Sequence, residues 1–509
     1  MTSEDQTDAV AFLTDVALPG FTGPVETIET HISRIFLAGN RAFKMKRAVK
    51  LPYADFSTPE LRHAACQKEV ELNSPTAPGL YHGVRRITRE ADGGLALDGR
   101  GELVDAVVEM KRFDQSHLLD RMAREGALTP DLMARTARMI ADFHRQAPVV
   151  HTGDGAANLA GVLDINKAGF ATSHVFATAE VGALDGQFRA ALSHHAETLD
   201  ERAAGGRIRR CHGDLHLRNI FVMDGQPRLF DCIEFSDQIA TVDVLYDLAF
   251  LLMDLWHRGF PDLANLVANR YLDQTGDEGG FVLLPFLMAI RAAVRAHVTA
   301  TQAESDGDPS SALRAMARSY FTLASELLKQ RPPRLIAIGG FSGSGKSTIA
   351  EALAFRIGAP PGARILESDR IRKALHGLPP DTRLPETAYR PEVSERVYAE
   401  MATRAGVILE AGGTVVANAV FDREPDRLHI ETAARQHDIA FYGYWLAVPH
   451  EELHRRVEQR VGGPSDADTE VLSRQLLKDT GEITWHCCEA SRDVGHVIST
   501  ILELVHEDG

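Results

Sequence analysis

The hydrophobic pattern of the first hundred residues consists of short runs that favour strands, whereas the pattern after about residue 112 is helical almost throughout. In a strand, successive side chains point to opposite faces, which gives a period of two. Ala38, Gly39 and Asn40 form a good hairpin turn between two of these runs. We predict strands over 25–30, 33–37, 41–46, 84–88 and 104–110, and a helix over 59–72. The pattern therefore predicts a small antiparallel sheet with one helix, followed by a larger helical lobe.

Paired prolines and charged residues over 329–334 interrupt the helical pattern. An apolar strand over 335–338, a glycine-rich loop and a helix follow, and further strands are predicted over 363–366 and 414–417. At 509 residues the chain exceeds the size at which a single core keeps growing. We predict two domains, 1–330 and 331–509, and divide the first into a small lobe at about 20–112 and a helical lobe at about 113–330.

The formal net charge of -16 disfavours nucleic acid and anionic membranes as main partners, and favours small anionic ligands. The acidic N-terminal segment has no basic region followed by an apolar one, so no secretory signal is expected. The longest apolar stretches, 281–290 and 245–256, are too short or are interrupted by acids. Five cysteines without regular spacing fit a reducing compartment. We expect a cytoplasmic protein without a membrane partner, and the oligomeric state stays open.

Residues 211–237 carry a pattern typical of a kinase catalytic loop. His212, Asp214 and Asn219 follow in H-x-D-x-x-x-x-N order, and Asp231 comes after the next predicted hairpin. Phosphoryl transfer from ATP needs a carboxylate near the acceptor hydroxyl, ligands for Mg²⁺ and a cation on the phosphates. The strand-turn-strand over 219–230 brings Asn219 and Asp231 together. We predict Asp214 as the catalytic base, and Asn219 and Asp231 as metal ligands.

This segment resembles the catalytic loop of the aminoglycoside phosphotransferase and choline kinase-like superfamily. The resemblance implies a strand lysine that binds phosphates and is paired with a helix glutamate. Lys44 is the preferred lysine, with Lys46 on the same strand face as the second choice. Glu69 is the preferred partner, with Glu71 as the alternative. The resemblance also implies that an interlobe hinge meets adenine through backbone groups of Glu109 and Met110.

Residues 340–348 read GFSGSGKST, which is the G-x-x-x-x-G-K-[ST] phosphate loop in its expected place between a strand and a helix. Its glycines allow backbone N–H groups to face phosphates at the positive end of the helix. Lys346 would reach the β- and γ-phosphates, and Ser347 would offer its hydroxyl to Mg²⁺. The predicted ATP-binding residues are Gly340, Phe341, Ser342, Gly343, Ser344, Gly345, Lys346, Ser347 and Thr348.

Downstream of this loop, residues 367–372 resemble the S-D-x-x-R element of zeta-toxin, polynucleotide-kinase and gluconate-kinase-like enzymes. The resemblance assigns Asp369 to the acceptor hydroxyl and Arg372 to substrate binding. A basic helix over 453–460 leads into a glycine-containing loop of the kind that closes over ATP, and its Arg456 and Arg460 would neutralise charge on the transferred phosphoryl group. Asn418 follows a strand where related kinases usually carry Asp, which reduces the negative charge offered to Mg²⁺.

Both halves together resemble a bacterial family described as bifunctional aminoglycoside phosphotransferase/ATP-binding proteins. The resemblance implies an α+β bilobal kinase-like domain followed by an α/β P-loop NTPase domain with a parallel sheet, using ATP and Mg²⁺. The first hypothesis is a kinase with two centres that phosphorylates hydroxyl groups of a small metabolite such as a sugar. The alternatives are a nucleotide-sensing regulatory protein with one active kinase domain, and a polynucleotide-end kinase, which the acidic composition disfavours.

Overall fold

The computed structural model describes residues 5–15, 23–30, 32–51, 54–305, 311–379, 382–459, 465–491 and 493–507. The chain forms two compact units, one made of residues 1–155 and 200–251, and the other of residues 156–199 and 252–509. These units are defined by contacts between residues and are not continuous segments of the chain. The predicted division of the chain at residue 330 therefore stays a prediction.

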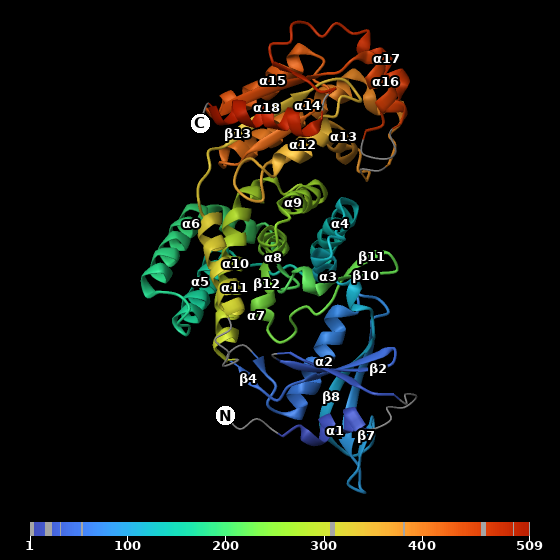
Figure 1. Ribbon diagram of the computed structural model, residues 1–509, viewed down its shortest axis with the longest axis vertical. Helices are drawn as coiled ribbons and strands as arrows, with labels where there is room; N and C mark the ends of the chain where they lie inside the picture. Colours follow the sequence, from blue (N-terminus) through green and yellow to red (C-terminus); the bar gives the residue numbers. More distant parts are fainter. Residues whose placement is uncertain are drawn as a thin grey trace. The chain divides into compact units, whose positions relative to one another are not determined.

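A six-stranded antiparallel sheet occupies the N-terminal part of the first unit, in the order β1-β2-β3-β8-β6-β7 (Figure 1). The hairpin between β2 and β3 turns at Gly39, whose φ of 58° suits a residue without Cβ. The strands are β1 (Glu26–Glu29), β2 (Ser33–Ala38), β3 (Arg41–Lys46), β6 (Tyr81–Arg89), β7 (Leu95–Leu97) and β8 (Glu102–Lys111). The predicted small antiparallel sheet is confirmed.

Alternating residues of β8 separate the two faces of this sheet. Val107 packs with Phe43 and with helix α1 (Thr7–Asp15), whereas Val108 packs with Cys66 of helix α2 (Pro59–Asn73). Helix α2 begins where the sequence predicts it, because the Thr58 side chain accepts a hydrogen bond from the first turn. The sheet thus carries α2 directly against β8, on the face opposite to α1.

Two short antiparallel pairs surround the H-x-D segment. β10 (Ile220–Met223) pairs with β11 (Gln226–Leu229), which confirms the predicted strand-turn-strand, and β9 (Ile208–Arg210) pairs with β12 (Thr241–Asp243). Helix α4 (Pro130–Gln146) packs against β11, and α8 (Val244–His257) begins directly after β12 (Figure 1). The shorter elements are β4 (Lys50–Leu51), β5 (Ala54–Asp55), η1 (Gln115–His117), α3 (Leu119–Arg124), η2 (Leu217–Asn219) and α7 (Asp237–Ala240).

Helices form the first part of the second unit. They are α5 (Gly155–Ala171), α6 (Thr178–Ala204), α9 (Pro261–Thr275), η3 (Glu278–Leu283), α10 (Leu284–Ser305) and α11 (Ser311–Leu327). Within the described part of the chain, one helical stretch, Glu278–Glu304, is long and apolar enough to cross a membrane by length and composition. Because 67% of its most apolar window is buried inside the protein, it also fits a core helix.

A five-stranded parallel sheet forms the C-terminal part of the second unit, in the order β14-β15-β13-β16-β17. The strands are β13 (Arg334–Gly339), β14 (Arg364–Glu367), β15 (Val415–Asn418), β16 (Ala440–Ala447) and β17 (His486–Glu489). The helices are α12 (Lys346–Ala354), α13 (Ser368–Leu375), η4 (Glu386–Tyr389), α14 (Pro391–Glu410), α15 (Glu424–Arg435), α16 (His450–Glu458), α17 (Thr469–Leu476) and α18 (Val494–Glu507). The predicted α/β fold with a parallel sheet is confirmed.

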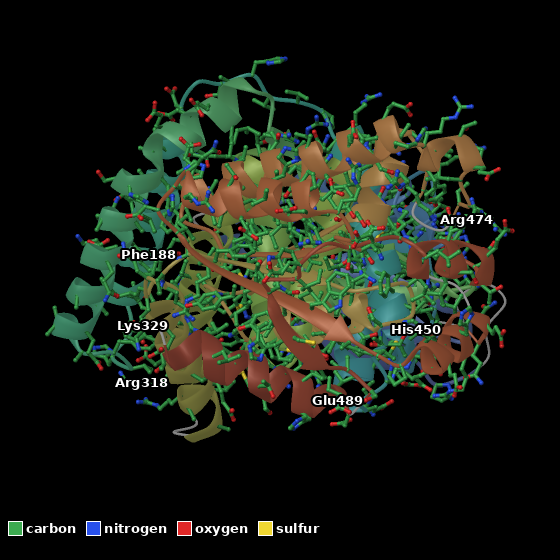
Figure 2. All side chains as sticks on the ribbon, turned by 90° about the horizontal axis from the view of Figure 1, so that it is seen from above. Phe188, Arg318, Lys329, His450, Arg474 and Glu489 are labelled. Carbon is green, nitrogen blue, oxygen red and sulfur yellow. The ribbon has the colours of Figure 1, made fainter. Side chains whose placement is uncertain are left out.

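The carboxyl ends of these parallel strands meet at one edge of the sheet, where α/β proteins bind their ligands. Figure 2 shows His450, at the start of α16, and Glu489, at the end of β17, at this edge. Helices α12 and α18 pack together on one face of the sheet, against Ile336, Ile338 and Val416. The phosphate loop connects β13 to α12 and therefore lies at the ligand-binding edge.

A buried ion network joins the edge strand β14 to α9 and η3 within the second unit. Arg364, which is 1% exposed, lies 2.8 Å from an Asp273 carboxylate oxygen and 2.8 Å from a Glu278 carboxylate oxygen. The Asn269 Oδ1 atom accepts hydrogen bonds from Arg364 at 3.0 Å and from the Ile365 backbone N–H at 2.7 Å. Burial acts to lower the pKa of Arg364, but Glu278 and Asp273 outweigh burial and raise it. The β14 edge is thus covered by charged partners from α9 and η3.

Candidate active sites

A buried carboxylate of α8 holds the H-x-D loop in place. Asp247 accepts the backbone N–H of His212 at 3.1 Å and that of Gly213 at 2.8 Å. Gly213 has a φ of 83°, in the left-handed region that favours glycine. The buried His212 ring donates from Nε2 to the Phe230 carbonyl at 3.0 Å, and burial lowers the pKa of His212. These contacts fix the loop that presents Asp214.

Asp214 and Asn219 lie side by side, as the spacing predicts. Asn219 Nδ2 donates to the Asp214 carboxylate Oδ2 at 2.9 Å and to the Asp214 backbone carbonyl at 2.9 Å. His216 Nε2 lies 3.3 Å from the same carboxylate oxygen, and the Asp214 side chain is 40% exposed. Because Asn219 uses its nitrogen on Asp214, its amide oxygen is the atom oriented to serve as a metal ligand.

Both lysines of β3 contact Glu69, but each also contacts a different second carboxylate. Lys44 Nζ lies 2.8 Å from Glu69 Oε1 and also contacts Asp231. Lys46 Nζ lies 2.6 Å from Glu69 Oε2 and also contacts Glu234. The structure thus places Lys44 beside Asp231, whereas Lys46 is fully buried. We call Lys44, Asp214, Asn219 and Asp231 the kinase cluster.

The charges around Lys44 keep it a cation. Burial acts to lower the pKa of Lys44, but Asp231, Glu69 and Glu234 outweigh burial and raise that pKa well above its usual value. Burial acts to raise the pKa of Glu69, but Lys44 and Lys46 outweigh it, so this pKa is lowered. A stable ammonium group beside the carboxylate of Asp231, a predicted metal ligand, is suited to bind phosphate oxygens.

The backbone at Asp231 is held in an uncommon conformation. Asp231 has a φ of 60°, in the left-handed region. Its backbone N–H donates to the Tyr81 hydroxyl at 3.3 Å, and the next N–H, of Cys232, donates to Asn73 Oδ1 at 2.9 Å. Such a conformation persists where the surroundings determine it, and it aims the Asp231 carboxylate at Lys44. No sequence pattern points to Tyr81 or Asn73, because both lie far from Asp231 along the chain.

The remaining predicted residues of this site lie apart from the kinase cluster. Glu71, the alternative partner, is exposed and lies 3.4 Å from Lys68. Glu109 and Met110 lie within β8, where Met110 pairs with Ala42 of β3, and the Glu109 carboxylate contacts Arg41 and Arg85. Their contact with adenine stays a prediction.

The phosphate loop forms the rim of a second site, a cavity of about 520 Å³ lined by residues 342–349. Gly343 and Gly345 have φ values of 86° and 94°, and a Cβ on Gly343 would lie 2.8 Å from the Leu453 carbonyl oxygen. Lys346 Nζ donates across the loop to the carbonyls of Gly340 at 2.8 Å and Phe341 at 3.0 Å. The loop is therefore a narrow cradle that only glycine permits at these positions.

Glu367 at the end of β14 belongs to this site, although the sequence reasoning gave it no role. Ser347 Oγ donates to Glu367 Oε1 at 2.5 Å, and Arg370 Nε lies 2.9 Å from Glu367 Oε2. Arg370 in turn lies 3.7 Å from Asp273 of α9. The sequence signal that could have identified Glu367 is its position, as an acidic residue at the carboxyl end of a predicted parallel strand.

Asp369 and Asn418 also line the cavity. Burial and the charge of Glu367 raise the pKa of Asp369, against a hydrogen bond from Ser465. A raised pKa makes a carboxylate a stronger proton acceptor. Asn418 pairs in register with Glu367, is 3% exposed, and its Nδ2 has no hydrogen-bond partner within the described ranges. Its amide is thus a buried donor beside the carboxylate of Glu367.

The three predicted arginines have different positions. Arg456 lines the cavity, contacts Glu452 at 2.6 Å, and places Nη1 4.0 Å from where a Cβ of Gly345 would lie. Arg372 donates to the Ala388 carbonyl at 2.7 Å and lies 4.9 Å over the Tyr389 ring; among the described residues it does not line the cavity. Arg460 and residues 461–464 of the predicted closing loop lie outside the described residues.

Both sites offer donor sets that fit Mg²⁺ and ATP. Mg²⁺ prefers carboxylate, amide and hydroxyl oxygens, usually together with phosphate oxygens. Asp231 and the Asn219 amide oxygen would supply them in the first site. Ser347 and Glu367 would supply them in the second, where the glycine cradle would take the phosphates.

Comparisons with known proteins match two separate segments of the chain to family models. Residues 86–282 match the family model described as "Phosphotransferase enzyme family", and residues 335–478 match the model described as "AAA domain". The fold and the two sites define a protein with two kinase-like domains. The chain thus joins a phosphotransferase-like domain to a P-loop kinase-like domain.

Two relatives cover different shares of the chain. An uncharacterized protein of Mycobacterium tuberculosis is 29% identical over 507 residues, which is 94% of this chain and 92% of the relative. A shikimate kinase of Bradyrhizobium diazoefficiens is 30% identical over 182 residues, which is 34% of this chain and 78% of that enzyme. Among solved structures, a choline/ethanolamine kinase family protein from Mesorhizobium loti matches with a TM-score of 0.41 and 16% identity, covering 63% of this chain and 94% of that one.

Proposed function

We propose that the protein is an ATP- and Mg²⁺-dependent kinase with two centres, each of which transfers a phosphoryl group to a hydroxyl group of a small metabolite such as a sugar. The observation that carries the proposal is the kinase cluster, in which Lys44, Asp214, Asn219 and Asp231 from distant segments come together. Phosphoryl transfer depends mainly on placement and charge, and this cluster supplies both. The similarity of the second domain to a shikimate kinase supports a small-molecule acceptor there.

In the first centre, each residue has a separate role. The Asp214 carboxylate is exposed enough to accept the proton of an incoming hydroxyl group, while Asn219 holds it in orientation. Lys44 would bind phosphate oxygens, positioned by Glu69. Bound Mg²⁺ would neutralise phosphate charge, and Asn219 and Asp231 would hold it.

In the second centre, Asp369 would orient the acceptor hydroxyl group, and its raised pKa favours proton acceptance. Lys346 would exchange its contacts with the loop carbonyls for phosphate oxygens. Glu367 accepts a hydrogen bond from Ser347 and pairs in register with Asn418 on the neighbouring strand. We therefore propose that Glu367 provides the negative charge that Asn418 lacks. Arg456, which lines the same cavity, would neutralise charge on the transferred phosphoryl group.

Transfer of labelled phosphate from ATP into pooled metabolites and RNA oligonucleotides tests the proposal. We expect Asp214→Asn and Lys346→Met each to remove one set of products, with a loss of at least about a hundredfold, and the double variant to remove both. Asp224→Asn, in the exposed turn after β10, and Lys329→Met, on the surface, are matched controls. Loss of all products in one single variant contradicts two centres, and unchanged products in both contradict both sites.

A nucleotide-sensing role for the second domain is the other candidate, and Asn418 favours it. An amide at this position binds less strongly to a Mg²⁺-water shell than a carboxylate. If ATP there only regulates the first centre, Lys346→Met will change the rate at the first centre, whereas Asp369→Asn will leave every product unchanged. Labelled RNA would instead indicate a polynucleotide-end kinase.

A further inference from the structure

A cavity of about 720 Å³ lies in the first unit, bounded by the end of α2, by α4 and by β11. Its wall includes His212, which opens the H-x-D loop, and Cys232, which follows Asp231. Within the described part of the chain, no member of the kinase cluster lines it. The cavity is therefore separate from the phosphate-binding groups but shares a wall with the two segments that carry Asp214 and Asp231.

The lining of this cavity is cationic in an acidic protein. The chain has a formal net charge of -16. The charged lining residues are Arg135, Arg138, Arg210, Arg228, Glu71 and Asp142, so arginines outnumber acids two to one. Of the two acids, Asp142 already lies 2.5 Å from the exposed Arg145. Arg135 and Arg210 are already paired with carboxylates outside the lining, Asp131 at 3.0 Å and Asp237 at 2.9 Å. The attraction of the cavity for an anion therefore depends on Arg228 in particular.

The guanidinium group of Arg228 has a buried N–H donor that lacks a hydrogen-bond acceptor. Its Nε atom is buried and has no hydrogen-bond partner among the residues that the structure describes. Leaving a buried donor unpaired costs about 1–3 kcal/mol, and more for a charged group. The guanidinium belongs to β11 and lines the cavity, so an anionic group bound there can lie next to it. Arginine also suits carboxylate and phosphate groups because its fork of N–H donors matches their geometry.

Apolar side chains complete the lining. Leu72, Met139 and Phe143 line the cavity together with Pro75, Pro148 and Pro227. Small-molecule sites typically enclose about 300–1,000 Å³ and combine apolar walls with a few polar groups.

We propose that this cavity binds a small organic anion with an apolar body, and that its occupancy alters phosphoryl transfer at the kinase cluster. Contacts already described connect the two places. The backbone N–H of Cys232, beside Asp231, donates to Asn73, which follows Leu72 of the lining. The backbone N–H of Gly213, beside Asp214, donates to Asp247. A ligand that displaces the wall thus changes where both carboxylates point. Its effect on transfer rests on the proposed function, whereas its binding does not.

Calorimetric titration of the full chain tests the binding, with octyl phosphate as the probe and both nucleotide sites saturated with a non-hydrolysable ATP analogue. Octyl phosphate and octanoate should bind, while octanol and inorganic phosphate should each bind at least about tenfold more weakly. Arg138→Gln and Arg228→Gln should each weaken octyl phosphate binding at least about tenfold. Arg121→Gln, an exposed arginine on α3, should change nothing.

Met139→Trp provides a variant that fills the cavity without removing a charge, and it should also prevent binding. Retained affinity for the ATP analogue shows that each variant is folded. Equal octyl phosphate binding in wild type and in the Arg138→Gln/Arg228→Gln double variant would overturn the proposed site. Binding of octyl phosphate only when the ATP analogue is absent would overturn it as well.

The rate of labelled-phosphate transfer tests the second part. Octyl phosphate should change the rate of the Asp214-dependent products at least about twofold in wild type, but not in Arg228→Gln, and the Lys346-dependent products should be unaffected. Binding without any rate change would contradict the coupling. If wild type made no product at all, the proposed function would fail, while the calorimetry would still decide whether the cavity is a site.

Discussion

At the scale of single residues, Asp426 in the first turn of α15 is a buried acid without adequate compensation. It is 3% exposed, and its Oδ2 atom has no hydrogen-bond partner in the described part of the chain. Burial raises the pKa of Asp426 to about 6, despite the nearby Arg423. Because the pKa is higher in the folded state than in the unfolded state, protonation stabilises the fold. That stability is complete below about pH 4 and is lost as the pH rises through about 6.

We therefore expect Asp426→Asn to stabilise the protein at neutral pH. The gain should be about 1–2 kcal/mol near pH 8 and should shrink towards zero as the pH falls to about 4, because the wild-type carboxyl group takes up its proton over this range. Thermal unfolding midpoints over this pH range measure the difference. Asp438→Asn, at an exposed position with a φ of 54°, is the control. A difference that does not vary with pH would contradict the explanation.

The two lysines of β3 should separate catalysis from stability. Lys44→Met should reduce transfer to the Asp214-dependent products at least about a hundredfold, because Lys44 contacts Asp231. Lys46→Met leaves Glu69 and Glu234 buried with one cation fewer, which should destabilise the first unit by about 3 kcal/mol. Urea unfolding curves and transfer rates, measured for both variants, distinguish a loss of stability from a loss of catalysis. Equal effects of both substitutions on the rate would refute the assignment of Lys44.

At the scale of elements, the contact of β14 with α9 and η3 depends on one buried cation. Arg364→Met would leave Asp273 and Glu278 without their shared partner, and we expect a loss of about 3–5 kcal/mol. The thermal midpoint of the second unit measures it. Arg435→Met is the control, since its side chain is 72% exposed and lies 3.9 Å from Glu431, a geometry worth less than about 1 kcal/mol. Similar losses in both variants would argue against the network.

Local elements could be predicted from the sequence because neighbouring residues determine them. The glycine-rich loop between β13 and α12, and the β10–β11 hairpin with Asp224 and Gly225 at its turn, each depend on residues close in the chain. The contact of Ser347 with Glu367 and that of Arg364 with Glu278 join residues 20 and 86 positions apart. Spacing along the sequence carries no information about such contacts. The position of Glu367 at the end of a predicted strand marks it as a candidate, but its contact with Ser347 is seen only in the structure.

At the scale of the whole molecule, the P-loop strands are not packed as an independent body. Their edge strand β14 takes its charged partners from α9 and η3, which precede residue 330. A fragment of residues 331–509 should therefore unfold at a lower temperature than the same strands in the full chain, since Arg364 loses its buried partners. Differential scanning calorimetry of both proteins checks this. A fragment as stable as the full chain would show that the network contributes little.

The placement of Arg364 also bears on how the gene can change. A chain split between α9 and β13 would leave two buried acids on one product and a buried cation on the other. Substitution of Arg364 alone, or of Asp273 and Glu278 alone, has the same cost. Gene fission should therefore be rare in this lineage, and replacements at these three positions should arise together, so that the two kinase-like halves are inherited as one reading frame.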